Sequence, residues 1–257
     1  MTVRLETLKT GIARLVVDRP QTRNALDWQS IAQFSAAIEQ LWAAPGIRCL
    51  ILTGAGQSFI AGGDLKVLHN FNQYEDGQRL SQEMTAALNR LEALPFPVIA
   101  AINGPARGGG AEIALACDLR LMAENADLGF VQIQLGLIPG WGAGQRLLRL
   151  VGYARALEYL ATGAVLSASQ ALSAGLVNRL STAETIQAEA LALAEQIASF
   201  DPQAVAAVKA FLQAGTQLPP ASAASFEQSL FAPLWAAEAH HQAVEKFLRR
   251  KKDDPKS

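Results

Sequence analysis

Short, continuously apolar segments constrain the fold of this chain more than any other feature. IRCLILTG (residues 47–54) and PVIAAING (residues 97–104) carry apolar runs rather than alternating polar and apolar residues. Strands with this pattern are buried on both faces, which is typical of a parallel sheet covered by helices. The segment after the first polar loop instead places Ile31, Phe34 and Ile38 at helical spacing. This alternation of strands and helices predicts an α/β core.

The remaining patterns divide the chain into two regions. Besides the segments above, we expect strands at 3–9, 11–18 and 118–124, and helices at 79–94 and 108–117. Asp27 and Asp64 are each placed to cap the helix that follows, and Ser181 with Glu184 forms a predicted capping box. Asp201 followed by Pro202 is a further helix start. We therefore expect an α/β core over residues 1–180 and a helical C-terminal region over residues 181–257.

Composition and charge exclude several classes of function. The chain has 257 residues and a formal net charge of -1, which gives no electrostatic basis for binding nucleic acid. Its two cysteines, Cys49 and Cys117, match neither a disulfide framework nor a metal-ligand spacing. The N-terminus lacks a signal-peptide pattern, and no apolar run reaches membrane-spanning length. We therefore expect a reduced, cytoplasmic protein with no membrane partner and no metal.

Two glycine-rich loops form the candidate functional site. Gly108, Gly109 and Gly110 open a predicted helix directly after a buried strand, and residues 61–63 form a similar loop after another. The first amides of a helix have no internal acceptor, and glycine lets a ligand oxygen approach them. Ligands of open α/β sheets bind at the carboxyl ends of the strands, where these loops would meet. One amide from each loop would make an oxyanion hole, although tight packing alone also explains such glycines.

Other familiar sites do not fit these residues. The stretch GPARGGG departs from the G-x-G-x-x-G dinucleotide fingerprint, and no P-loop lysine is present. The histidines His69, His240 and His241 lie beside no serine in a nucleophile elbow, which argues against a Ser-His-Asp hydrolase.

The order of the motifs resembles the crotonase superfamily, the enoyl-CoA hydratase/isomerase family. The likeness spans essentially the whole chain, and its most specific parts are the F-x-A-G-x-D and GGG-x-E motifs at this separation. The segments that carry it are NALD (24–27), SFIAGGDL (58–65), INGPARGGGAEIALACD (102–118), LGLIPGWGAGQRL (135–147) and LSASQALSAGLV (166–177).

This resemblance implies a fold, a ligand and an assembly. The fold would be a spiral of ββα repeats followed by a helical C-terminal trimerisation region, giving a homotrimer or a dimer of trimers. The ligand would be an acyl-CoA thioester, with coenzyme A entering as part of the substrate rather than as a cofactor. The amides of Gly63 and Gly109 would hold the thioester oxygen. The residues that would line the CoA channel and the acyl pocket are Ala25, Leu26, Ala61, Asp64, Leu65, Leu68, Gly140 and Trp141.

Glu112 is the candidate proton-transfer residue, two positions after the glycine triplet. An acidic residue in a first helical turn can serve the helix dipole alone, but a partly apolar pocket would raise the pKa of its carboxyl and fit it for general acid–base work. The resemblance implies a second glutamate in hydratases, and the residue that aligns with it here is Gln132. An amide cannot exchange protons at neutral pH, and a missing acid or base typically costs about 10²–10⁴ in rate.

The replacement at Gln132 leaves several reactions open. Hydratase/isomerase chemistry ranks first on the breadth of the family, and a double-bond shift requires only one proton carrier. Decarboxylation of a methylmalonyl- or ethylmalonyl-type thioester follows closely, because the segment with Trp141 and Gln132 also resembles ethylmalonyl-CoA decarboxylases. Gln132 would then bind a substrate carboxylate or be an inert substitution, and Trp141 would wall the acyl pocket or be a core or interface aromatic. A non-catalytic acyl-CoA-binding or scaffold protein is the remaining alternative.

Overall fold

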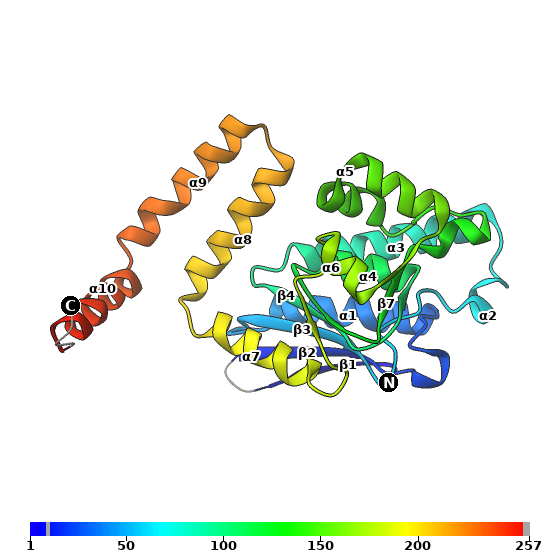
Figure 1. Cartoon of the computed structure of the whole chain (residues 1–257), viewed down its shortest axis with the longest axis horizontal. Coiled ribbons are helices and arrows are strands. Elements are labelled where there is room, and N and C mark those ends of the chain that lie inside the picture. Colours follow the sequence, from blue (N-terminus) through cyan, green and yellow to red (C-terminus); the bar gives the residue numbers. More distant parts are fainter. Residues whose placement is uncertain (9–10, 254–257) are drawn as a thin grey trace. The chain divides into compact units, whose positions relative to one another are not determined.

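The computed structural model describes residues 1–8 and 11–253 (Figure 1). It comprises two compact units, Met1–Ala198 and the part of the chain from Ser199 onward. The sequence patterns place the division near residue 180. The first unit extends further because the next helix, α7 (Ile186–Ala198), packs on strands of the main sheet.

The first unit is built on a six-stranded sheet within the described residues. The first two strands pair antiparallel, and every later pairing is parallel. In spatial order the strands are β1 (Val3–Thr7), β2 (Ile12–Val17), β3 (Cys49–Gly54), β4 (Val98–Ile102), β6 (Leu119–Ala123) and β9 (Arg179–Ser181). The predicted α/β core with parallel buried strands is therefore confirmed.

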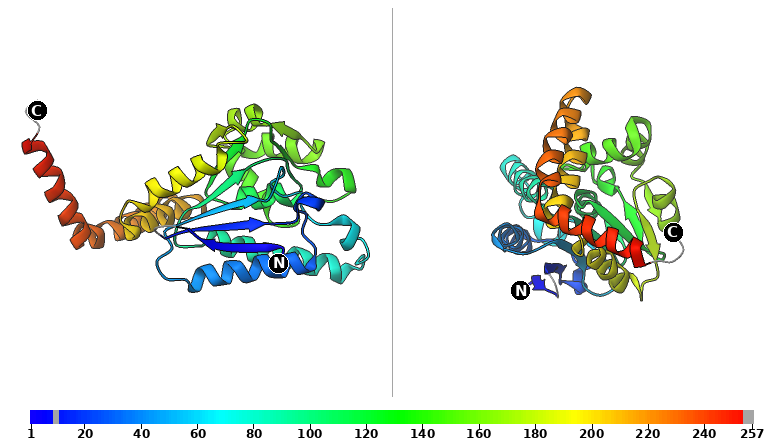
Figure 2. Two further views of the ribbon diagram at one scale, coloured as in Figure 1. Left: turned by 90° about the horizontal axis from the view of Figure 1, so that it is seen from below. Right: turned by 90° about the vertical axis from the view of Figure 1, so that its left-hand side faces the viewer.

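Helices on both faces explain the apolar composition of the central strands. Every residue of β3 and β4 is buried. Helix α1 (Trp28–Ala43) lies on one side of the sheet and α7 on the other (Figure 2). The buried residues of α1 include Ile31, Phe34 and Ile38, the positions that predicted its periodicity. Asp27 caps this helix as expected, since its carboxylate accepts a hydrogen bond from the Ser30 amide at 2.8 Å.

The other helices of this unit follow the expected order, with two local corrections. Helix α3 starts before residue 79, because Gln73 and Asp76 form a capping box that the periodicity did not reveal. The capping box predicted at Ser181 and Glu184 is wrong, since Ser181 belongs to β9 and the Thr182 hydroxyl accepts the Thr185 amide instead. The helices between β3 and β9 are α2 (Leu65–Leu68), α3 (Tyr74–Glu92), α4 (Gly109–Ala116), α5 (Ala143–Thr162, with a break at Gly152) and α6 (Ala168–Ser173).

A small second sheet and two short 3₁₀ turns support the loops at the strand ends. Strand β7 (Asp127–Gly129) pairs parallel with β5 (Ala106–Arg107) and antiparallel with β8 (Val165–Ser167). The 3₁₀ turn η2 (Pro20–Thr22) follows β2, and η3 (Val131–Leu135) follows β7. Strand β5 therefore fixes the residues immediately before the glycine triplet.

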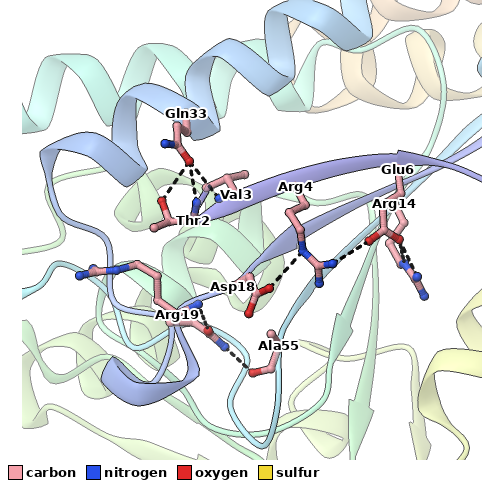
Figure 3. A network of polar contacts seen from close by, with 10 residues as sticks. Thr2, Val3, Arg4, Glu6, Arg14, Asp18, Arg19, Gln33 and Ala55 are labelled. Atoms are coloured by element: carbon pink, nitrogen blue, oxygen red, sulfur yellow. Dashed lines mark hydrogen bonds and ion pairs between the residues drawn. The ribbon is translucent and has the colours of Figure 1, made fainter.

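Polar contacts fasten the edge strand β1 to its neighbours (Figure 3). The side-chain oxygen of Gln33 accepts hydrogen bonds from the amides of Thr2 at 2.8 Å and Val3 at 3.1 Å, which ties the strand to α1. Arg4 pairs with Asp18 at 3.1 Å. The two bonds to Gln33 satisfy main-chain donors at the start of the edge strand, which would otherwise be open to other chains.

The second unit is helical. Asp201 caps α8 (Pro202–Gln217) by accepting the Ala204 amide at 2.9 Å, as predicted. Helix α8 packs against α9 (Pro220–Trp235), which contains Pro233 and is followed by α10 (Glu238–Asp253). Within the described part of the chain, no helix has the length and hydropathy that crossing a bilayer requires.

Candidate active site

The two glycine-rich loops meet at the carboxyl ends of β3 and β4. A methyl group added at Gly62 would come within 2.9 Å of the amide nitrogen of Gly109, so the two loops touch. The amide of Arg107 also donates to the carbonyl of Ile60 at 3.1 Å. The sequence expectation that both loops converge on one place is confirmed.

Each glycine of the triplet is required for its own reason. Gly108 has a φ of +51°, a conformation that side chains disfavour. A Cβ on Gly109 would lie 2.0 Å from Cζ3 of Trp141, and one on Gly110 would lie 1.7 Å from the carbonyl oxygen of Ile60. Packing therefore explains Gly110, while Gly109 stands directly beneath a buried aromatic ring.

The backbone at Gly63 and at Gly109 leaves each amide outside the main-chain hydrogen bonds of its neighbours. Leu26 forms a parallel bridge with Gly63 by donating to the Gly62 carbonyl and accepting from the Asp64 amide, each at 2.8 Å. In such a bridge the amide of the middle residue points to the opposite side. Gly109 is the first residue of α4, so its amide has no acceptor one turn earlier in the helix.

Asn24 is a buried hub that holds the loop before α1 in place. Its side-chain oxygen accepts the Arg19 amide at 2.9 Å, and its nitrogen donates to the carbonyls of Ala55 at 2.9 Å and Ser58 at 2.8 Å. The carbonyl of Arg23 accepts the Ala61 amide at 3.1 Å. The NAL segment is therefore fastened to the loop that carries Gly63, and Ala25 and Leu26 are buried against it.

A buried ion cluster completes this connection. The guanidinium of Arg19 pairs with Asp27 at 2.9 Å and with Asp64 at 3.1 Å, and it also donates to the carbonyl of Ala25. Asp64 precedes α2, but its side chain makes no capping bond; the predicted cap is wrong because Arg19 takes that carboxylate. The sequence placed Arg19 in a polar loop without a role.

We expect Arg19→Met to destabilise the protein by about 3–5 kcal/mol, because two carboxylates would lose a buried cation. Urea unfolding of both proteins measures the change. Arg4→Met is the matched control, since the Arg4 side chain is 47% exposed and such surface pairs contribute about 1 kcal/mol or less. Equal unfolding midpoints for the two variants would contradict a structural role for the cluster.

Glu112 lies one turn into α4 and is 2% exposed. Its Oε2 atom accepts hydrogen bonds from the amides of Trp141 at 2.7 Å and Ala143 at 3.1 Å, and its Oε1 atom accepts one from Nε2 of Gln132 at 3.0 Å. Burial raises the pKa of Glu112, and the hydrogen bonds oppose that shift without cancelling it. A carboxyl in this setting is suited to take up and return a proton.

Gln132 and Trp141 therefore belong to the same cluster as Glu112. Gln132 lies in η3 and contacts the glutamate directly, as its alignment with a second glutamate implies. Trp141 is 5% exposed, and its carbonyl accepts a hydrogen bond from the buried Arg146 at 3.0 Å. Trp141 is thus a buried aromatic, and it also covers Gly109.

The remaining predicted residues surround the loops. Leu68 is buried, and a Cβ on Gly63 would lie 2.8 Å from its Cδ1 atom, whereas Leu65 is exposed. The carbonyl of Gly140 accepts a hydrogen bond from the Ser81 hydroxyl at 2.6 Å. Sequence patterns did not reveal Ser81, because its partner lies 59 positions away along the chain. They did not reveal the Ala143 amide either, because a main-chain donor does not depend on residue type.

A hollow of about 560 Å³ opens beside the loops. Its lining includes Ala61 and two arginines, Arg23 and Arg107. The Arg107 guanidinium pairs with both carboxylate oxygens of Asp127, at 2.5 and 2.6 Å, so Arg23 supplies most of the positive charge here. This hollow suits an extended ligand with anionic groups.

Comparison with known proteins agrees with this geometry. The sequence model of the enoyl-CoA hydratase/isomerase family matches residues 7–256. An enoyl-CoA isomerase/hydratase of Mycosarcoma maydis is 35% identical over 95% of this chain and 92% of its own length. A short-chain-enoyl-CoA hydratase of Clostridium acetobutylicum is 35% identical over 94% of this chain and 92% of its own.

Solved structures support the same assignment. The crystal structure of an enoyl-CoA hydratase from Bacillus anthracis superimposes with a TM-score of 0.93 at 32% identity, over 97% of each chain. One from Mycobacterium smegmatis gives a TM-score of 0.92 at 28% identity, over 97% of each chain. By fold, motif order and sequence, this chain belongs to the enoyl-CoA hydratase/isomerase family.

Proposed function

We propose that this protein adds water reversibly to a 2-enoyl-CoA thioester, with Glu112 as its proton carrier. The observation that supports this most is the position of the Glu112 carboxylate in the helix whose first amide belongs to Gly109. A general base and one of the two donors proposed to hold an enolate oxygen are thus parts of one short element.

The proposed substrate pose follows from the loops. The thioester oxygen accepts hydrogen bonds from the amides of Gly63 and Gly109, and the acyl chain passes towards Leu68, Gly140 and Trp141. The CoA moiety lies along Ala25, Leu26 and Ala61, with its phosphates near Arg23 in the adjoining hollow. The protein needs no further cofactor for this chemistry.

One carboxylate is enough for both proton transfers of this reaction. The oxygen of a water molecule attacks C3, the C2–C3 double bond shifts its electrons towards the thioester oxygen, and Glu112 takes the water proton. The resulting enolate places its charge on the oxygen at the two amides, which stabilise it more than they stabilise the substrate. Glu112 then returns the proton to C2, which restores the carboxylate and gives the 3-hydroxyacyl thioester.

A double-bond shift is the second candidate, and the single carboxylate favours it. In that reaction Glu112 removes a proton from C2 of a 3-enoyl thioester and returns it to C4, so no second acid is needed. Decarboxylation has less support, because a substrate carboxylate beside Glu112 would meet a like charge. A non-catalytic acyl-CoA-binding protein would not need a buried glutamate held by main-chain amides.

Three thioesters supplied in parallel test the proposal. Crotonyl-CoA loses the absorbance of its conjugated double bond on hydration, a 3-enoyl-CoA gains it on isomerisation, and ethylmalonyl-CoA loses the mass of carbon dioxide. We expect the protein to turn over crotonyl-CoA, and we compare that rate with its rate of 3-enoyl-CoA isomerisation. Turnover of ethylmalonyl-CoA alone would reverse the assignment, and tight binding of all three without turnover would identify a binding protein.

We further propose that the chain assembles as a homotrimer or a dimer of trimers. Several large apolar side chains of the helical unit are exposed in the single chain, which a partner subunit would cover. They are Phe231, Trp235, Phe247 and Leu248, each more than half exposed.

A further inference from the structure

Arg146 is a buried cation in the first turn of α5, and it is only 4% exposed. Its Nη2 atom donates to Oε2 of Glu92 at 2.9 Å and to Oδ1 of Asn89 at 2.8 Å, both on α3. Its Nη1 atom donates to the main-chain carbonyl of Trp141 at 3.0 Å. A buried charge requires partners that offset its lost hydration, and these partners connect α3 with the turn that precedes α5.

The turn at residues 141–143 supplies the main-chain donors of Glu112. The Trp141 amide donates to Oε2 of that carboxylate at 2.7 Å, and the Ala143 amide donates to the same oxygen at 3.1 Å. Gly142 lies between them with a φ of +93°, and a Cβ there would lie 2.6 Å from Nη1 of Arg146. The guanidinium therefore packs against the turn in addition to binding its first carbonyl.

The same side of α3 also holds the residue before the turn. The hydroxyls of Ser81 and Thr85 donate to the carbonyl of Gly140 at 2.6 and 3.3 Å. Ser81, Thr85 and Asn89 are four residues apart, so they lie along one side of the helix. This row of polar side chains therefore fastens the turn twice, directly at Gly140 and through Arg146 at the next carbonyl.

The bond to the Trp141 carbonyl exceeds what an ion pair between two helices requires. Arg149 also pairs with Glu92, at 3.2 Å, and within the described part of the chain it binds no atom of the turn. Without the Arg146 guanidinium, the Trp141 carbonyl would lose its donor, and the turn would relax towards another one. A shift of about 1 Å caused by a remote residue can cost about 10² in rate.

We propose that Arg146 is a positioning residue, which acts through the turn at residues 141–143 to hold the Glu112 carboxylate in the orientation that the reaction uses. Arg146 itself exchanges no proton. This role rests on the proposed hydration, because only a reaction that uses this carboxylate responds to its orientation. The contribution of Arg146 to the rate should therefore disappear when Glu112 is replaced.

A double-mutant cycle tests this role. Arg146→Lys keeps a positive charge beside Glu92, but a single ammonium cannot reproduce the planar fork that also reaches Asn89 and the turn. We expect kcat for crotonyl-CoA hydration to fall by about 10², whereas butyryl-CoA binding should change little. In the Glu112→Gln background, followed at enzyme excess, the same change should alter the residual rate by less than about twofold.

Arg149→Lys is the matched control, since it makes the same change in the same helix beside the same carboxylate. It should leave kcat close to the starting value in both backgrounds. The stoichiometry of butyryl-CoA binding counts the folded sites, so each rate is expressed per binding site. If Arg146→Lys does not fold, Asn89→Ala takes its place, because it removes one anchor of the guanidinium and keeps the pair with Glu92. The same dependence on Glu112 is expected of it.

The outcomes are distinct. Equal losses of rate in both backgrounds would overturn the positioning role, because Arg146 would then act on the fold and not through Glu112. A kcat for Arg146→Lys that matches the kcat of Arg149→Lys would overturn it as well. A wild-type protein that binds butyryl-CoA without hydrating crotonyl-CoA would instead refute the proposed function, and the inference with it.

Discussion

Replacing Glu112 with glutamine should lower kcat for crotonyl-CoA hydration by about 10²–10⁴, the usual contribution of a general acid or base. Binding of butyryl-CoA should change little, because that ligand requires no proton transfer. Glutamine can still accept the amides of Trp141 and Ala143, and its nitrogen can donate to the Gln132 oxygen once that amide turns over. Steady-state kinetics and calorimetry on the same preparation measure the two quantities.

Stability provides the control for this variant. Burial raises the pKa of Glu112, so the charged carboxylate is less favourable in the folded chain than in the unfolded one. The contribution of this group to stability is therefore full below its unfolded pKa, about 4.3, and is lost as the pH rises through the folded pKa. Glu112→Gln should be at least as stable as the wild type at neutral pH. An unchanged kcat in the folded variant would remove Glu112 from the mechanism.

The second large effect is expected at Gly109. A methyl group there would overlap Trp141, with 2.0 Å between Cβ and Cζ3, and would displace either the ring or the start of α4. We expect Gly109→Ala to destabilise the protein by about 3 kcal/mol. Hydration should also slow by about 10²–10³, the loss typical of one missing oxyanion donor.

Two further substitutions show whether the ring is the cause. Trp141→Ala combined with Gly109→Ala removes the overlapping atoms and should recover most of the lost stability, measured by thermal unfolding. Gly144→Ala is the matched control in a neighbouring helix, because its Cβ would meet no atom within 4 Å. If Gly109→Ala melts together with Gly144→Ala, the contact between Trp141 and Gly109 does not constrain the site.

Local sequence patterns predicted much of this fold. The unbroken apolar runs of β3 and β4 predicted buried parallel strands, and the carboxylates of Asp27 and Asp201 predicted two helix starts. The positions of the two glycine-rich loops predicted that they converge, since each follows a buried parallel strand and the carboxyl ends of such strands meet at one edge of the sheet. These features are encoded within a few residues, so the sequence displays them.

Contacts between distant segments could not be read in the same way. The sequence assigned Asp64 to helix capping, whereas a guanidinium 45 positions earlier in the chain takes its carboxylate (residue 64 against residue 19). Main-chain donors such as the Ala143 amide have no signature in residue identity. The contact of Gln132 with Glu112 also required geometry, because residue identity does not show which end of the amide faces the carboxylate.

The fixed orientation of Glu112 has a stereochemical consequence. Because Oε2 is held by two peptide N–H groups, the proposed hydration would use one atom, Oε1, both to collect the proton and to deliver it. In the proposed pose that atom would reach the acyl chain from one side. Hydrogen and hydroxyl would then be added to the same face of the double bond, and the held carboxylate would determine the configuration at both new centres.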